Sequence, residues 1–171
     1  MASELTVQTL RGPTSGANAD TVLIPSGQTL HAPGHVIQVV NNKGTGGSGT
    51  TSTSWSAVSS IVTITPKFAT SKIVVQFFAT AYTQNGTAYF TIARDGVPIG
   101  DGANDGLAQM NRSGDSNPFY MPSSLSTYVS SIGSTASTEF RVYIRVAAGA
   151  EGYWPAGSVD QWTAYAWEIA Q

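Results

Sequence analysis

The chain has 171 residues, no cysteine, 11% charged side chains and a formal net charge of −2. This length suits a single domain, and the weak net charge gives no electrostatic reason to expect nucleic acid or an anionic membrane as a partner. Disulfides and thiolate metal sites are excluded. The N-terminus lacks the apolar run of a signal peptide, and no apolar stretch is long enough to cross a bilayer as a helix. We therefore expect a soluble protein made in a cytoplasm.

Residues 1–34 differ from the rest of the chain and predict an extended N-terminal arm. Apolar and polar residues alternate only weakly here, and glycines and prolines interrupt the segment: Gly12, Pro13, Gly16, Pro25, Gly27 and Pro33. One short apolar stretch stands among them, at Val22, Leu23 and Ile24. An extended segment binds by adding to an exposed sheet edge. We expect these three side chains to anchor the arm on another protein, with residues 35–171 as the main domain.

A glycine-rich stretch at 41–55, NNKGTGGSGTTSTSW, follows the apolar run GHVIQVV at 34–40. Gly44, Gly46 and Gly49 have the G-x-G-x-x-G spacing of a dinucleotide-binding loop, in which the glycines precede a helix whose N-terminus holds the pyrophosphate. The Ser/Thr-rich residues that follow show no helical periodicity, and no carboxylate stands where the ribose needs one. We expect a flexible loop between strands and no bound cofactor.

The longer apolar segments alternate with a period of two, which is typical of β-strands. Strands are expected at 60–66, 72–82, 87–94, 97–100, 137–148 and 160–170. Both faces of 72–82 are apolar, which predicts a central strand or one covered by a neighbouring subunit. Asp95 and Gly96 predict a tight hairpin turn, and Pro98 places the return strand at a sheet edge.

Connections rich in Gly, Ser and Asn are expected between the strands, at 41–54, 100–118, 131–137 and 147–158. No stretch of a dozen residues has helical periodicity. Several short strands separated by turns predict an all-β fold, an antiparallel β-sandwich or jelly roll.

Four aromatic residues stand beside prolines or glycines, outside the expected strands: Phe119, Tyr120, Tyr153 and Trp154. Exposed rings stack on sugar faces, and exposed apolar patches mark interfaces. One interpretation is therefore that they contact a host glycan or a neighbouring subunit. The other is that they pack at the open ends of the sandwich core, since tryptophan is mostly buried.

The chain carries no complete catalytic or metal-binding motif. Ala-Pro-Gly separates the two histidines, His31 and His35, so they do not form a helical ligand pair; three copies of one histidine could still converge on a metal at a trimer axis. Asp101, Asn104 and Asp105 resemble a calcium loop but lack its spacing and closing Glu. No serine stands in a nucleophile elbow, and no two carboxylates are marked as a glycosidase pair. We expect no enzyme activity and no metal.

Four segments, taken in order, resemble a known family. They are PSGQTLHAPGHVIQVV (25–40), ITPKFATSKIVVQ (64–76), TIARDGVPIG (91–100) and WTAYAWEIAQ (162–171). Over residues 22–171 the chain is similar to small virion proteins of tailed bacteriophages, familiar from phages of cyanobacteria and from the tips of tail fibres. The resemblance implies a trimeric β-sandwich displayed on a virion, with no known catalysis.

These observations predict a homotrimeric capsid decoration (cement) protein, located on the virion, whose arm binds the major capsid protein or another virion protein. The lack of repeats, heptads and a shaft in the sequence favours decoration over a long fibre. The alternative is a short tail fibre or fibre tip that recognises host polysaccharide. A third interpretation, a glycan-processing enzyme, needs an acid/base pattern that the sequence does not show.

Overall fold

The structure is a computed structural model, and it describes residues 14–16, 24, 26, 28–99, 106–112, 114, 116–157 and 159–171. The chain divides into two units, 1–31 and 32–171. The second unit, the sandwich domain, holds every strand of the described residues. Of the proposed anchor, Val22 and Leu23 lie outside the described residues, and Ile24 is exposed. The anchoring role of the arm stays a prediction.

The described residues form strands and no helix, so none of them belongs to a helix that could cross a membrane. In chain order the strands are β1 Val36–Thr45, β2 Ser48–Thr50, β3 Ser56–Ile64, β4 Lys72–Gln84, β5 Gly86–Arg94, β6 Val97–Pro98, β7 Ala108–Arg112, β8 Phe119–Val129, β9 Thr138–Val146, β10 Glu151–Trp154 and β11 Gln161–Ile169. The predicted all-β class is confirmed.

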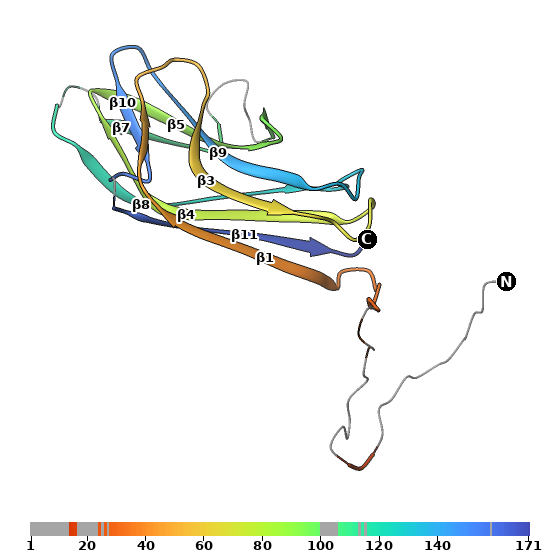
Figure 1. Cartoon of the computed structure of the whole chain (residues 1–171). Coiled ribbons are helices and arrows are strands. Elements are labelled where there is room, and N and C mark those ends of the chain that lie inside the picture. The colour runs from red at the N-terminus through yellow and green to blue at the C-terminus, as the bar shows by residue number, and fades with distance from the viewer. Residues whose placement is uncertain are drawn as a thin grey trace. The chain divides into compact units, whose positions relative to one another are not determined.

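The strands pair antiparallel in two sheets, which form the two layers of Figure 1. In sheet A, β1, β11, β4 and β8 lie side by side, and the short pair β2 and β10 extends the β1 and β11 side. In sheet B, β3, β9 and β5 lie side by side, and β6 and β7 share the other edge of β5. Because β4 has partners on both sides, the prediction of a central strand at 72–82 is confirmed.

The pairing is nested along the chain. Setting aside the short strands β2, β6 and β10, the first strand pairs with the last (β1 with β11), and then β3 pairs with β9, β4 with β8 and β5 with β7. This is the strand order of a jelly roll, in which one long hairpin is rolled into two packed sheets. The sequence predicted a sandwich or a jelly roll, and the observed connectivity is that of a jelly roll.

The core lies between the two sheets and is filled by the inward faces of their strands. Its largest fully buried apolar side chains are Trp154, Phe77, Phe90, Phe140, Ile64, Ile73, Ile92, Leu125, Ile132 and Ile144. Alternation explains this set, because every second residue of a strand points to the same side of the sheet. Burying one such side chain is worth about 1.5–3 kcal/mol.

The glycine-rich stretch at 41–54 is not the flexible loop that the sequence predicted. Gly44 lies in β1 opposite Trp162, and Gly49 lies in β2 opposite Tyr153. A Cβ on Gly44 would lie 2.7 Å from the indole ring of Trp162, and one on Gly49 would lie 2.2 Å from the ring of Tyr153. The glycines therefore let aromatic rings of the neighbouring strand lie over the backbone, and no helix follows them.

We expect Gly44→Ala to lower the free energy of unfolding by about 1–3 kcal/mol, because the added methyl forces the Trp162 ring out of its packed position. Chemical denaturation measures this loss. The matched control is Gly157→Ala, where the added methyl meets only the carboxylate end of Asp160, at 3.3 Å. Equal losses at the two positions would show that contact with Trp162 is not the cause.

Three further strands were not predicted: β7 and β10 fall in expected connections, and β8 was missed altogether. All three contain glycine, proline or several polar residues, which weaken the apolar alternation. Their pairing partners hold them: β7 pairs with β5, β10 with β4, and β8 with β4 along its whole length. The prediction that Pro98 marks an edge is confirmed, since β6 pairs with β5 alone.

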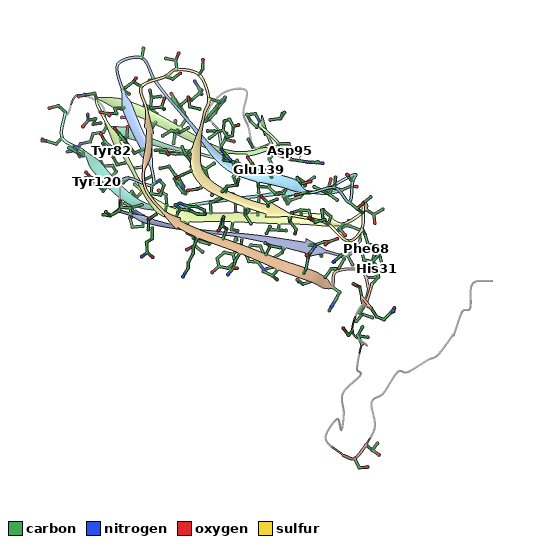
Figure 2. The ribbon with its side chains drawn as sticks, in the orientation of Figure 1. His31, Phe68, Tyr82, Asp95, Tyr120 and Glu139 are labelled. Atoms are coloured by element: carbon green, nitrogen blue, oxygen red, sulfur yellow. The ribbon has the colours of Figure 1, made fainter. Side chains whose placement is uncertain are left out.

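The Asp95-Gly96 hairpin turn also connects to β9. Asp95 has a φ of 47° and Gly96 a φ of 84°, as expected for a turn with two left-handed residues. The Asp95 carboxylate accepts a hydrogen bond from the Glu139 N–H at 2.9 Å, and the Asp95 N–H donates to the Glu139 carbonyl at 2.9 Å. Figure 2 shows these two residues side by side. The turn thus fixes where β9 begins.

We expect Asp95→Ala to cost about 1–2 kcal/mol, because alanine disfavours the left-handed backbone and leaves the Glu139 N–H without this acceptor. Asp95→Asn is the control, since asparagine tolerates that backbone and keeps an acceptor oxygen. Thermal unfolding of the three proteins gives the comparison. A loss for Asn as large as that for Ala would contradict this account of the turn.

Candidate interaction surface

The outer face of sheet A carries rows of side chains that the strand register aligns. One row crosses four strands, from Val39 on β1 to Trp167 on β11, Val74 on β4 and Tyr128 on β8. Ile169 follows Trp167 on the same face of β11. Val36, Val74, Trp167 and Ile169 line one shallow hollow. We call Val36, Val39, Val74, Tyr128, Trp167 and Ile169 the apolar patch.

A second row lies near the other end of the same face. Tyr153 on β10, Tyr82 on β4 and Tyr120 on β8 are aligned by register. Their rings stack, with centroids 4.8 Å apart for Tyr82 and Tyr153 and 5.3 Å for Tyr82 and Tyr120. We call these three residues the tyrosine row; Figure 2 labels Tyr82 and Tyr120 together at that end. Eight residues along β4 separate it from the apolar patch, or about 26 Å at 3.3 Å per residue.

Glu151 holds the tyrosine row in place. The Tyr153 hydroxyl donates to one oxygen of the Glu151 carboxylate at 2.8 Å, and the Gln84 amide donates to the other. Burial and the neighbouring carboxylate raise the pKa of Tyr82 to about 12, and the hydrogen bond to Glu151 raises the pKa of Tyr153. Both pKa values lie further above neutral pH than the ordinary tyrosine value, so the two phenols stay uncharged over a wider alkaline range.

The outer faces of the two sheets differ in charge. On sheet B, Glu139 and Arg141 form an ion pair at 2.9 Å, and the Arg145 guanidinium lies 4.3 Å from the Tyr89 ring centroid. On sheet A, Lys72 borders the apolar patch: it lies opposite Ile169, and its amine sits 4.2 Å from the Tyr128 ring centroid. An apolar face with little charge is the surface that a partner covers at least desolvation cost.

The four aromatics singled out in the sequence lie in different environments. Tyr120 is 57% exposed, and Tyr153 is half-buried on the other side of Tyr82 in the tyrosine row. Phe119 is partly buried against the core, with the Arg112 guanidinium 5.6 Å from its ring centroid. Trp154 is fully buried in the core and packs on Phe90, so an exposed position for it is corrected. Alternation on β10 explains the difference, because Tyr153 and Trp154 are neighbours and point to opposite faces.

Sequence reasoning missed Tyr128 and Val39 as surface residues. Tyr128 was missed because β8 was not recognised as a strand, and Val39 because nothing in the sequence says which face of β1 is outward. Period-two alternation of Phe119, Leu125 and Val129 on the inner side of β8 was the signal that could have placed Tyr128 outside.

Glu168 is the one fully buried carboxylate of the described residues and the first candidate for a catalytic group. Its oxygens accept hydrogen bonds from four groups: the Lys67 N–H (2.8 and 3.0 Å), the Phe68 N–H (3.0 Å), the Ser71 hydroxyl (2.7 Å) and the Gln38 amide (2.6 Å). These donors come from β1 and from the loop before β4. With both oxygens engaged, the carboxylate ties three segments together and is not poised for proton transfer.

The same network joins three of the four segments on which the family resemblance rests. Gln38 lies in segment 25–40, Lys67 and Ser71 in segment 64–76, and Glu168 in segment 162–171. The remaining segment, 91–100, contains the Asp95 turn, and its Arg94 donates to the Ile132 carbonyl at 2.7 Å. All four segments have structural contacts in this fold.

The other carboxylates that the structure describes have local partners as well. Glu139 pairs with Arg141, Glu151 holds Tyr153, and the Asp160 carboxylate accepts from the Gly157 N–H at 3.0 Å. Within the described ranges, no group of three or more His, Asp or Glu could hold a metal ion. Asp101, Asn104 and Asp105, the candidate cation loop, lie outside those ranges.

No protein-family model and no curated protein matches the chain. What the structure defines is a class of fold, an antiparallel β-sandwich with jelly-roll strand order and an apolar patch on the outer face of sheet A. The resemblance to phage virion proteins stays a prediction.

Proposed function

We propose that the protein is a non-enzymatic structural component of a tailed-phage virion, a homotrimer that decorates the head as a cement protein. The observation that carries the proposal is the apolar patch of sheet A. Monomeric soluble proteins rarely expose contiguous apolar surface of this kind, and here it lies on regular strands with uncharged side chains at its centre. Further copies of the chain are the occupants that a homotrimer supplies.

Two other features support the proposal. The jelly-roll order is common in viral capsid domains. The segments on which the family resemblance rests supply the Glu168 network and the Asp95 turn, and both stabilise this fold. In this proposal the arm, residues 1–34, binds the major capsid protein by adding to a sheet edge, and three arms on one trimer bind with avidity.

Sedimentation equilibrium at micromolar concentration tests the oligomer and should give three times the mass of one chain. A stable monomer would overturn the homotrimer. Copy number from quantified virion proteins tests the location, with hundreds of copies expected for a head protein.

A short tail fibre or fibre tip is the second candidate, and a few to a few dozen copies per virion would favour it. The observation on its side is Tyr120 of the tyrosine row, which is 57% exposed and offers an aromatic surface of the kind that stacks on sugar rings. Both candidates share the homotrimer, so only the location separates them.

A further inference from the structure

A groove crosses the outer face of sheet A between Phe78 and the tyrosine row, and it arises from an interruption of the sheet. β11 pairs with β4 as far as Thr163 opposite Phe78, and β10 pairs with β4 again from Tyr82 onward. Between these points β4 has no strand partner on this side. The Thr80 carbonyl accepts instead from the Ala156 N–H, in the chain that connects β10 to β11, at 2.7 Å.

The lining of the groove is uncharged and rich in hydroxyl groups. Its outward polar side chains are Thr80, Ser124, Gln161 and Thr163, and Phe78 and Pro122 add apolar surface. Hydroxyl and amide groups donate and accept hydrogen bonds without a fixed charge. Such a lining suits a ligand that also carries many neutral donors and acceptors.

Aromatic rings flank the groove on both sides. Phe78 forms one wall and is 41% exposed. On the other side, Thr80 and its partner Pro122 line the groove. Tyr82 lies two residues from Thr80 on β4, and Tyr120 lies two residues from Pro122 on β8. Tyr82 covers one face of the Tyr120 ring, and more than half of Tyr120 remains exposed.

We propose that this groove binds a neutral oligosaccharide. A pyranose ring has one apolar face of C–H groups and a rim of hydroxyls, so it needs an aromatic surface and neutral hydrogen-bonding side chains together. Phe78 and Tyr82, on the two sides of the groove, lie four residues apart on β4, or about 13 Å at 3.3 Å per residue. This spacing exceeds the width of a single sugar ring.

The same features argue against an anionic ligand. A phosphate or sulfate is held by Arg, Lys or backbone N–H groups, and no cationic side chain lines this groove. Glu151 stands beside the tyrosine row and repels anions. Binding of a sugar in this groove is compatible with a position on the head or on the tail.

The test is a glycan array of neutral and acidic oligosaccharides, followed by titration of any ligand against the full chain. We expect binding to neutral oligosaccharides with a dissociation constant near 1 mM per site, a weak affinity of about −4 kcal/mol. Phe78→Ala and Tyr120→Ala should each weaken it at least tenfold. Tyr128→Ala is the matched control: this tyrosine is on the same strand as Tyr120, 59% against 57% exposed, but belongs to the apolar patch. It should bind as the parent does.

Three outcomes would overturn the proposal: no binding on the array, binding of acidic glycans only, or binding that Tyr120→Ala leaves unchanged. Competition by an extended peptide without sugar would assign the groove to a protein partner and also overturn it. Sedimentation of the same variants separates this question from the oligomer, because Tyr120→Ala should keep the parent's mass whether or not it binds sugar.

Discussion

Replacing Glu168 with alanine should lower the free energy of unfolding by about 3–5 kcal/mol, the loss expected when one member of a buried charged network is removed. The Lys67 and Phe68 N–H groups, the Ser71 hydroxyl and the Gln38 amide would all lose their acceptor at once. Denaturant unfolding monitored by tryptophan fluorescence measures the loss. A loss below about 1 kcal/mol, the usual size for a surface position, would contradict the network.

The same carboxylate predicts a pH dependence. Burial alone would raise its pKa, but four donors lower it below the ordinary 4.5: the Lys67 N–H, the Ser71 hydroxyl, the Gln38 amide and the Phe68 N–H. A carboxylate whose pKa is lower in the folded state stabilises the fold above its unfolded pKa and loses that contribution as the pH falls through its folded pKa. The free energy of unfolding should therefore fall below about pH 4.5, and less steeply in Glu168→Gln than in the parent.

Glu151→Gln is the matched control for this pH dependence. Glu151 also accepts hydrogen bonds from side chains, but it is half-buried on the outer face of sheet A. We expect this substitution to leave the acid-induced fall in the free energy of unfolding close to that of the parent. If both variants reduce this fall equally, Glu168 is not its main source.

Val39→Asp should convert the proposed trimer into monomers at micromolar concentration. Val39 is 53% exposed in the single chain, so the aspartate stays hydrated in the monomer and the fold loses little. In an interface the same carboxylate is desolvated without a partner, which costs several kcal/mol per copy. Sedimentation velocity across a dilution series measures the shift, and circular dichroism checks that the sandwich persists.

Val97→Asp is the matched control for the trimer. Val97 is also an exposed strand valine, 66% exposed, but it lies on β6 in sheet B. It should remain trimeric. If Val97→Asp dissociates the trimer and Val39→Asp does not, the interface lies on sheet B and the apolar patch has another role.

Alternation of side chains made the central elements predictable. Ile73, Val75 and Phe77 point to the core as expected, and the two apolar faces of 72–82 correctly predicted that β4 has a strand partner on each edge. The edges were not predictable in the same way. β8 carries Pro122 and four serine or threonine residues, and β1 continues through Gly44, so their pairing depends on the register of a distant partner. A local pattern does not contain that information.

The candidate surface was predictable only in part. The tyrosine row joins Tyr82, Tyr120 and Tyr153, which lie far apart in the sequence and meet because β8 and β10 flank β4. Glu168 was also predictable only in part. Its place in an alternating strand says that it points inward, but only the loop at 65–71 explains why a charge is tolerated there.

The nested pairing of the strands has a consequence for biosynthesis. The partner of β1 is β11, so the first strand to leave the ribosome waits for residues 161–169 before it can form its ladder. Until then the nascent chain exposes the edge of β4 and its apolar side chains, which favour aggregation. Chains dominated by such distant contacts fold in milliseconds to seconds. Expression yield should therefore respond strongly to temperature and chaperone supply, even where the finished sandwich is stable.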